Sequence, residues 1–361
     1  MSGLAVNTLE RLPSEIFVEI FRFIDSYHIH KAFYDLNRRF SSLVRTYGMR
    51  YLDLTELDMR QCRTMLSDTD CSEVKTLKLS NKYTTDQIDQ ILCKDSYPLI
   101  KFQSLYSLSL DSIGLFTLHS IIDDMIYLNH LQVLIIQFRS DLCEEKLIDT
   151  YRWLLNRYSL QMKSLKVLYL YISENSTPIL ENQYISRVKS SSIDPNTSLK
   201  YLVLNHIPIQ DIQSILIRFP NLRQLGALVR LDPNIDDYPS ALSLKCCYLY
   251  IFASEFFSVV NLFRKCPNLE QLTIDFDLID VDALDGEEWR NLLESYLPKL
   301  KQFKLCMTLF SETLNEIEDL IQVTFSQNKF WIEKKALINV QKPDTTAGVD
   351  TAIGVTIEFL I

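Results

Sequence analysis

Glycine is scarce in this sequence, which has only seven glycines in 361 residues. Phosphate-binding loops, strained nucleophile turns and tight hairpins all need positive φ, which glycine adopts at the least steric cost. The scarcity argues against a chain organised around such loops. It predicts connections made of helices and of Asn, Asp and Ser turns.

Motifs for catalysis and metal binding are also missing. The chain contains no G-x-S-x-G, no P-loop, no H-E-x-x-H and no G-x-G-x-x-G. Its eight cysteines form no C-x-x-C pair, and its five histidines are scattered rather than paired with cysteines or acids. We therefore expect no enzyme activity, no metal and no cofactor, and we expect most of the thiols to lie in the core.

Long apolar runs and clustered positive charge are the last absences. No run of 18 apolar residues occurs, and the start MSGLAVNTLERLP has neither a basic region nor an apolar stretch. We expect no membrane span and no signal peptide, and a cytoplasmic or nuclear location. The formal charge of −9 argues against nucleic acid as a partner. Apolar residues make up 47% and charged residues 23%, as in a folded protein.

The sequence does contain a repeated frame of the form apolar-x-x-apolar-x-apolar. Consecutive frames start 23 to 34 residues apart except at one step of 47, which a weaker match at Cys246, Leu249 and Ile251 divides, so we expect ten units. Three of the frames follow a Pro-Asn or Pro-Lys pair, which suits a strand start. The nine clear frames are MRYLDL (49–54), VKTLKL (74–79), LYSLSL (105–110), LQVLII (131–136), LKVLYL (165–170), LKYLVL (199–204), LRQLGA (222–227), LEQLTI (269–274) and LKQFKL (300–305).

The frames predict short strands that alternate with helices. Helical periodicity lies between them at 117–127, 145–156, 209–219 and 256–266. No single strand–helix unit can cover its own apolar face, so stacking is expected to give an α/β horseshoe with parallel strands on the concave side and helices on the convex side. The spacing resembles irregular leucine-rich repeats of the long type.

Two stretches break the frame. Residues 173–198 are rich in Ser and Asn and predict an excursion from the array. The tail 341–361 ends in VTIEFLI, which could form an edge strand that pairs with 329–340 as a C-terminal cap. We therefore expect three regions: a helical domain at 1–48, a leucine-rich-repeat-like solenoid at 49–340, and a tail or capping strand at 341–361.

The first region predicts three short helices. Pro13 suits a first helical turn, and Ile16, Phe17, Ile20, Phe21 and Ile24 recur on one helical face. Ser26 and Asn37 are candidate caps of the second and third helices. So small a body buries little apolar surface, which predicts that it leans on the first repeat or on a partner.

This region resembles an F-box. The resemblance rests on Leu9-x-x-Leu12-Pro13-x-Glu15-Ile16-x-x-x-Ile20-Phe21-x-x-Ile24 and on Ala32-Phe33-x-x-Leu36-Asn37-x-Arg39-Phe40-x-x-Leu43. The tryptophan common late in that family is absent, and Phe40 or Tyr47 could take its place. The resemblance implies that an SCF-type ubiquitin ligase adaptor binds here, with Leu9, Leu12, Pro13, Ile16 and Ile20 as the contact residues.

A horseshoe binds partners through exposed side chains on its concave sheet. The predicted contact residues alternate with the buried leucines, and the tyrosines are favoured as binding anchors. They are Gln137, Arg139, Tyr169, Tyr171, Asn205 and Asp275. Seven acids between Asp275 and Glu288 could steer a basic segment or simply form a solvated rim, and their spacing does not fit a calcium loop.

These observations predict a substrate-recognition subunit of an SCF-type (cullin-RING) ubiquitin ligase. The adaptor and the cullin scaffold would be partners through the head, and an unidentified protein substrate would bind the array. One alternative is a non-catalytic leucine-rich scaffold that acts outside ubiquitination. Another is a repeat-fold enzyme or a nucleic-acid binder.

Overall fold

The computed structural model describes two compact units. Residues Met1–Leu165 with Ile172–Ser176 form the first, and Lys166–Tyr171 with Thr177–Ile361 form the second. Each unit is α/β, which confirms the expected class. The described residues are 11–94, 97–139, 150, 154–155, 161–172, 195, 198–209, 212–229, 231, 237–252, 256–277, 285–310, 321–341 and 352–360.

The first unit begins with a helical head, as the sequence predicts. Asn37 caps the third helix by accepting the Phe40 amide at 3.0 Å. The second helix is capped by Asp25, whose carboxylate accepts the His28 amide at 3.0 Å, so the expectation of a Ser26 cap is wrong by one residue. The helices are α1 (Ser14–Phe21), α2 (Ser26–Phe33) and α3 (Arg38–Leu43), followed by a π-helical turn (Val44–Gly48).

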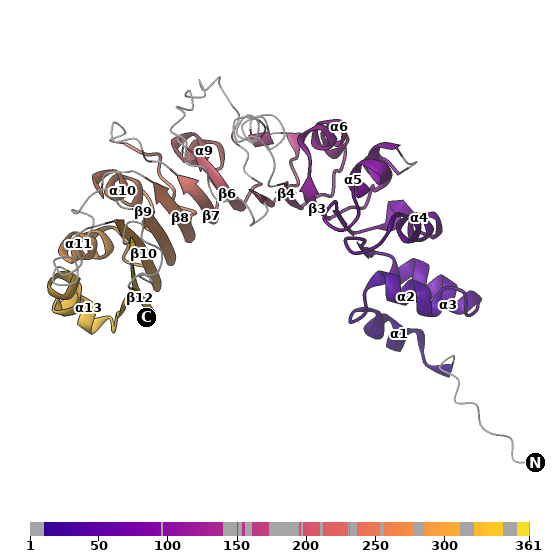
Figure 1. Cartoon of the computed structure of the whole chain (residues 1–361), viewed down its shortest axis with the longest axis horizontal. Coiled ribbons are helices and arrows are strands. Elements are labelled where there is room, and N and C mark those ends of the chain that lie inside the picture. Colours follow the sequence, from indigo (N-terminus) through magenta and orange to yellow (C-terminus); the bar gives the residue numbers. More distant parts are fainter. Residues whose placement is uncertain are drawn as a thin grey trace, which may run out of the picture. The chain divides into compact units, whose positions relative to one another are not determined.

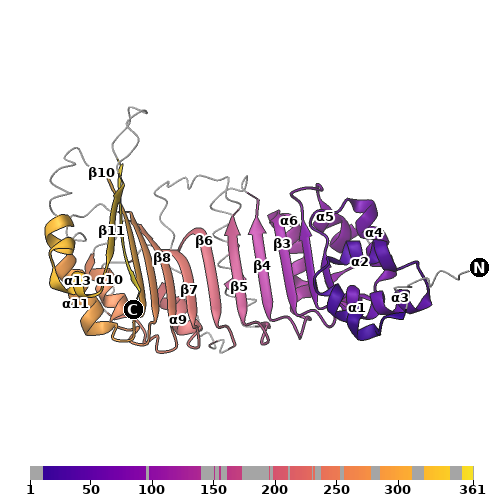
Figure 2. The ribbon, with the colours of Figure 1, turned by 90° about the horizontal axis from the view of Figure 1, so that it is seen from below.

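Four parallel strands follow the head, each paired with the next along the chain. Helices cover one face of this sheet and leave the other open (Figures 1 and 2). The strands are β1 (Tyr51–Asp53), β2 (Thr76–Ser80), β3 (Ser107–Ile113) and β4 (Val133–Phe138), and the helices are α4 (Met59–Asp68), α5 (Gln87–Asp89) and α6 (Leu115–Met125).

The second unit repeats this plan with six parallel strands and closes with an antiparallel pair. Its helices again cover one face of the sheet (Figure 1). The parallel strands are β5 (Val167–Ile172), β6 (Tyr201–Ile209), β7 (Gln224–Val229), β8 (Cys246–Phe252), β9 (Gln271–Asp277) and β10 (Gln302–Phe310), and the helices are α9 (Ile212–Arg218), α10 (Phe256–Phe263) and α11 (Gly286–Tyr296). The closing elements are a π-helical turn (Gln322–Ser326), α13 (Lys329–Glu333), β11 (Leu337–Gln341) and β12 (Ala352–Leu360).

The repeated frame predicts the parallel strands closely. Each of the nine clear frames becomes a strand that starts two residues after the frame does, and its three apolar positions are buried. The weaker match is also a strand, but its register needs correction. Leu244, Cys247 and Leu249 are the buried positions, whereas Cys246 is only half-buried, so this frame starts at residue 244.

The expected helices at 117–127, 209–219 and 256–266 are confirmed as α6, α9 and α10. Most of the segments 145–156 and 173–198 lies outside the described residues. The expected cap is correct in part. β12 does pair with β11, but it lies between β10 and β11, antiparallel to both, so β11 is the edge strand. Residues 329–333, expected to pair as strand, are helical because Asn328 caps them.

Candidate protein-binding surfaces

Helix α1 of the head has a buried face and an exposed face. Phe17 and Phe21 are buried, at 0% and 6% exposure. Leu12 and Ile16 keep 38% and 44% of their surface exposed, and their neighbour Pro13 is exposed as well. Of the other expected contact residues, Ile20 is half-buried and Leu9 lies outside the described residues. The head therefore presents an apolar stripe, Leu12–Pro13–Ile16, to solvent.

Aromatic rings form the core beneath this stripe. The Phe17 ring meets the Phe40 ring edge-on, with centroids 4.8 Å apart. The centroids of the Phe21 and Phe33 rings are 5.5 Å apart. Phe40 is fully buried, whereas Tyr47 is 40% exposed. These ring contacts form the centre of the head, and Leu12 and Ile16 lie at its periphery.

Arg39 holds the Leu12–Pro13 turn against α3. Its guanidinium donates to the backbone carbonyl of Leu12 and to Ser14 Oγ, and it lies 5.8 Å from the centroid of the Phe17 ring. The two halves of the F-box-like pattern thus meet in space. This contact fixes the conformation from which the exposed stripe projects.

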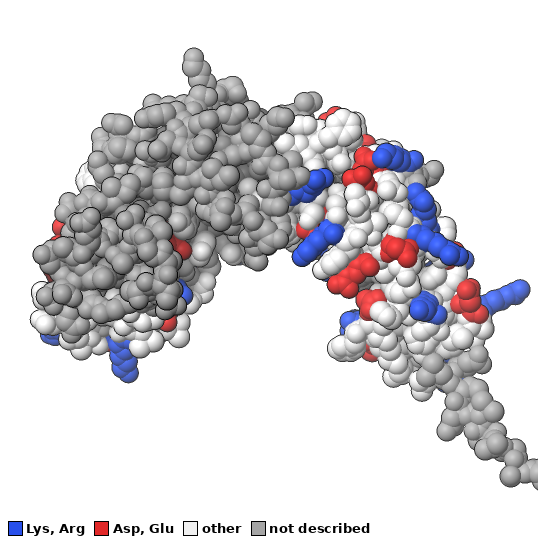
Figure 3. Space-filling model, in the orientation of Figure 1, with Lys and Arg blue, Asp and Glu red and all other residues white. Residues whose placement is uncertain are grey.

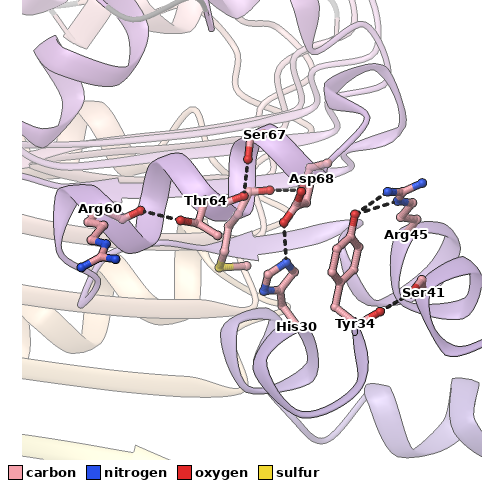
Figure 4. Close-up of polar contacts among 10 residues, drawn as sticks. His30, Tyr34, Ser41, Arg45, Arg60, Thr64, Ser67 and Asp68 are labelled. Carbon is pink, nitrogen blue, oxygen red and sulfur yellow. Dashed lines mark hydrogen bonds and ion pairs between the residues drawn. The ribbon is translucent and has the colours of Figure 1, made fainter. Parts of the chain in front are cut away.

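The head is joined to the first strand–helix repeat through polar contacts with α4. His30 Nε2 lies 3.0 Å from Asp68 Oδ2 (Figure 4). Gln61 Nε2 donates to the Tyr27 hydroxyl at 2.8 Å. His30 also stacks on Tyr34, at 4.5 Å between ring centroids. The head leans on the first repeat, one of the two arrangements that its size predicts. These contacts use α2, so Leu12 and Ile16 on the α1 side remain exposed.

The open face of the second sheet carries three of the predicted contact residues. Tyr169, Tyr171 and Asp275 are half-buried and alternate with buried core residues, so they lie on the face away from the helices. They are not all close together: β6, β7 and β8 separate Tyr169 from Asp275. Asn205 lies in β6, and its side chain is outside the described part of the chain.

The open face of the first sheet carries Gln137, which is half-buried, and Arg139, which is exposed just after β4. Lys78 Nζ binds Asp53 Oδ2 at 2.9 Å across neighbouring strands of this face. On the side of the first unit that Figure 3 shows, basic and acidic side chains are interspersed and do not gather by sign.

A row of basic residues along the strand starts of the second unit was not anticipated from the sequence. Each member sits at the second position of its frame. Except at Lys301, the last of the row, its backbone carbonyl accepts two amides from the start of the next strand, the first at 2.7–2.8 Å. This repeated bond places the members side by side at the N-terminal ends of the strands, whose alignment Figure 2 shows. The row, called the edge row below, is Lys166, Lys200, Arg223, Lys245, Glu270 and Lys301.

Glu270 is the one acid in the edge row. Its two carboxylate oxygens bind Lys245 Nζ and Lys301 Nζ, each at 2.6 Å. These two ammonium groups lower the pKa of Glu270 to about 2. The carboxylate therefore stays ionised at physiological pH and neutralises part of the row.

The other three members are cations that form no ion pair with an acid among the described residues. Lys166 and Arg223 are exposed and Lys200 is half-buried. No ion pair joins any of them to another residue within the described ranges. The signal in the sequence was Lys or Arg after the first apolar residue of successive frames, which is visible only when the frames are aligned with one another.

Beyond Glu270 and Lys301 the edge row borders a hollow of about 730 Å³. Its walls are apolar at Leu293, Phe330 and Phe359. Lys334 lies over the rings of Phe330 and Phe359, at 5.7 and 5.9 Å from their centroids. The hollow therefore combines apolar walls with charged side chains, which are Lys299, Lys301, Lys334, Glu270 and Glu294.

The predicted acid cluster is described only in part. Asp285 caps α11 by accepting the Glu287 amide at 2.8 Å, and Glu287 pairs with Arg290 and Asn328. In the described ranges no group of three His, Cys, Asp or Glu residues is placed to hold a metal ion. The described helices include none with both the length and the apolar character needed to cross a membrane.

The comparisons with known proteins give no family for this chain. No protein-family model matches the sequence, and no curated protein matches it. A functional proposal therefore rests on the geometry of the head, of the open sheet faces and of the edge row.

Proposed function

We propose that this chain is the substrate-recognition subunit of an SCF-type ubiquitin ligase. In this proposal the head binds the ligase adaptor, which links the chain to the cullin scaffold, and the repeat region holds a protein substrate. The chain itself carries out no chemistry. The observation that supports it best is the exposed stripe Leu12–Pro13–Ile16 above a closed aromatic core.

Neighbouring apolar side chains that are exposed to water are stabilised when a partner protein covers them, so such a stripe is typical of a binding surface. Leu12 and Ile16 belong to the half of the motif for which the resemblance implies adaptor contact, and Arg39 fixes the turn between them and the core. Had Leu12 been buried under the first repeat, no such contact would be possible. The exposure supports the proposal, and adaptor binding itself is a prediction.

The proposal includes a continuous leucine-rich horseshoe as the substrate receptor. Two features support it: the parallel strands pair in chain order within each unit, and the helices gather on one face. An open parallel sheet face of this kind offers a surface rather than a pocket, which suits a protein ligand.

The experiment is affinity purification of the tagged chain from cells, with quantification of adaptor and cullin. The double variant Leu12→Asp/Ile16→Asp should lose both, because two carboxylates would be desolvated in the interface, at a cost of several kcal/mol. Its melting temperature is measured as well, because Leu12 and Ile16 keep only 38% and 44% of their surface exposed and loss of the adaptor counts only if the head stays folded. The matched control is Phe116→Asp on α6, where an 81%-exposed apolar side chain outside the head is changed in the same way.

Retention of adaptor by the double variant, or its absence from the wild-type pull-down, would refute the proposal. Recovery of adaptor without cullin would instead favour a scaffold that acts outside ubiquitination.

A further inference from the structure

The edge row of the second unit concentrates positive charge in a chain whose formal net charge is −9. Five of its six members are basic, and the sixth, Glu270, is held between two of them. An acidic protein with a clustered basic feature keeps a local field that attracts anions, although its overall charge repels them. The feature is therefore not explained by solubility alone.

The spacing of the edge row is set by the sheet. Neighbouring strands lie about 4.8 Å apart, so six members span about 24 Å, which is the length of about seven residues of extended peptide. The backbone bonds that repeat from Lys166 to Lys301 hold the six Cα positions rigidly, so only the side chains have to be ordered on binding.

Four of the six parallel strands begin with a neutral residue whose side chain can hydrogen-bond, directly after the residue of the edge row. These residues, called the neutral row, are Tyr201, Gln224, Gln271 and Gln302; they are aligned across the sheet, with Cys246 between the first two and the last two. Amide and hydroxyl groups of this kind can bond to the backbone of an extended chain, while the lysines and the arginine contact its side chains. The two rows together match a peptide that has carboxylates on one side.

We propose that the edge row binds an acidic, extended segment of a partner protein. This deepens the proposed function and rests on it, since it names the class of segment that the repeat region would hold. The row is one residue wide and includes an acid, whereas nucleic-acid binding depends on a broader basic patch. A peptide is therefore the occupant that the charges favour.

The hollow beyond Lys301 offers a further contact for the same peptide. Its apolar walls at Leu293, Phe330 and Phe359 fit a bulky apolar side chain that follows the acidic stretch. The segment would then run along the edge row and end in this hollow.

The test measures fluorescence anisotropy with the purified full-length chain and a labelled twelve-residue peptide of alternating Glu and Ala that ends in Leu. The same peptide with Gln in place of Glu is the neutral probe, and a twelve-nucleotide single-stranded DNA is the competing anion. The wild type should bind the Glu peptide more tightly than either. Affinity should fall as salt rises, because screening weakens exposed charge pairs.

Two variants act on the row in opposite directions. Lys200→Glu/Arg223→Glu should weaken binding of the Glu peptide by about tenfold, since it replaces two attractions by two repulsions. Glu270→Gln should strengthen binding about twofold, because it removes the only anion of the row. The control Lys329→Glu changes charge on α13 and should stay within about twofold of the wild type.

No binding of the Glu peptide at low salt, equal binding of the Glu and Gln peptides, or equal loss in the Lys329→Glu control would overturn the inference. Tighter binding of DNA than of the Glu peptide would overturn it as well, in favour of a nucleic-acid partner. The measurement uses neither adaptor nor cullin, so its failure is distinct from failure of the adaptor pull-down, which tests the head.

Discussion

Gly286 begins α11 at a place where no side chain fits. A Cβ there would lie 2.3 Å from the carbonyl oxygen of Thr324, which belongs to the backbone and cannot rotate away. Gly286→Ala should therefore lower the free energy of unfolding by about 3 kcal/mol, at the upper end of the range for overpacking. A urea titration followed by tryptophan fluorescence measures it, since Trp331 donates to the Gly286 carbonyl at 3.1 Å.

Gly114 provides the matched control for that substitution. It precedes α6, and a Cβ there would meet nothing within 4 Å. Gly114→Ala should change the free energy of unfolding by less than about 1 kcal/mol, allowing for the weaker capping preference of alanine. Equal effects of the two substitutions would contradict the packing explanation.

Buried thiols should differ sharply from exposed ones in reactivity. Burial raises the pKa of Cys62 and of Cys266 to about 12, so almost no thiolate exists at pH 8, and neither thiol is accessible. Cys93 is exposed, and burial of part of its thiol, together with nearby Asp89, raises its pKa as well. Iodoacetamide should therefore label Cys93 before the other two, and below the pKa of Cys93 its labelling rate should rise about tenfold for each unit by which the pH is raised.

Peptide mapping by mass spectrometry at pH 7, 8 and 9 reads out this order. Labelling of Cys62 or Cys266 in the folded chain at a rate equal to that of Cys93 would show that those sites open in solution. In urea all three should react at similar rates, because the burial that separates them is lost.

At the scale of elements, β12 closes the sheet of the second unit. It pairs along its whole length with β10, and Val355, Ile357 and Phe359 are buried. A chain that ends at Gln341 would expose the edge of β10 and lose the contact between the Phe359 and Phe303 rings, whose centroids lie 5.4 Å apart. We expect a loss of about 3 kcal/mol or more and self-association through the open edge.

Size-exclusion chromatography with light scattering measures that self-association. Thr356→Ala, a half-buried position on the other face of the same strand, is the control and should elute as the wild type does. If the shortened chain stays monomeric and melts at the wild-type temperature, β12 does not have the closing role assigned to it.

The parallel strands could be predicted from the sequence because the frame sets both position and register. Three apolar positions spaced three and two residues apart can all reach one core only if the last two lie in a strand. The order of the closing pair could not be predicted in this way. VTIEFLI has the alternation of a strand wherever it pairs, and only packing decides that it enters between β10 and β11.

At the scale of the whole molecule, the net charge of −9 gives no indication that basic residues gather in the edge row. Neighbouring members of the row are 22 to 34 residues apart in the chain, so a short stretch of sequence contains at most one of them. The exposed stripe of the head is the opposite case. Leu12, Pro13 and Ile16 are close in sequence, so a local pattern was enough to single them out.

The antiparallel closure decides where this architecture can lengthen. An added strand–helix repeat could enter between two of the parallel strands, where its carbonyl would accept the same two amides as its neighbours do. After β10 it could not, because β12 occupies that edge with the opposite chain direction. Gene duplications that extend such an array should therefore leave its final hairpin in place and accumulate upstream.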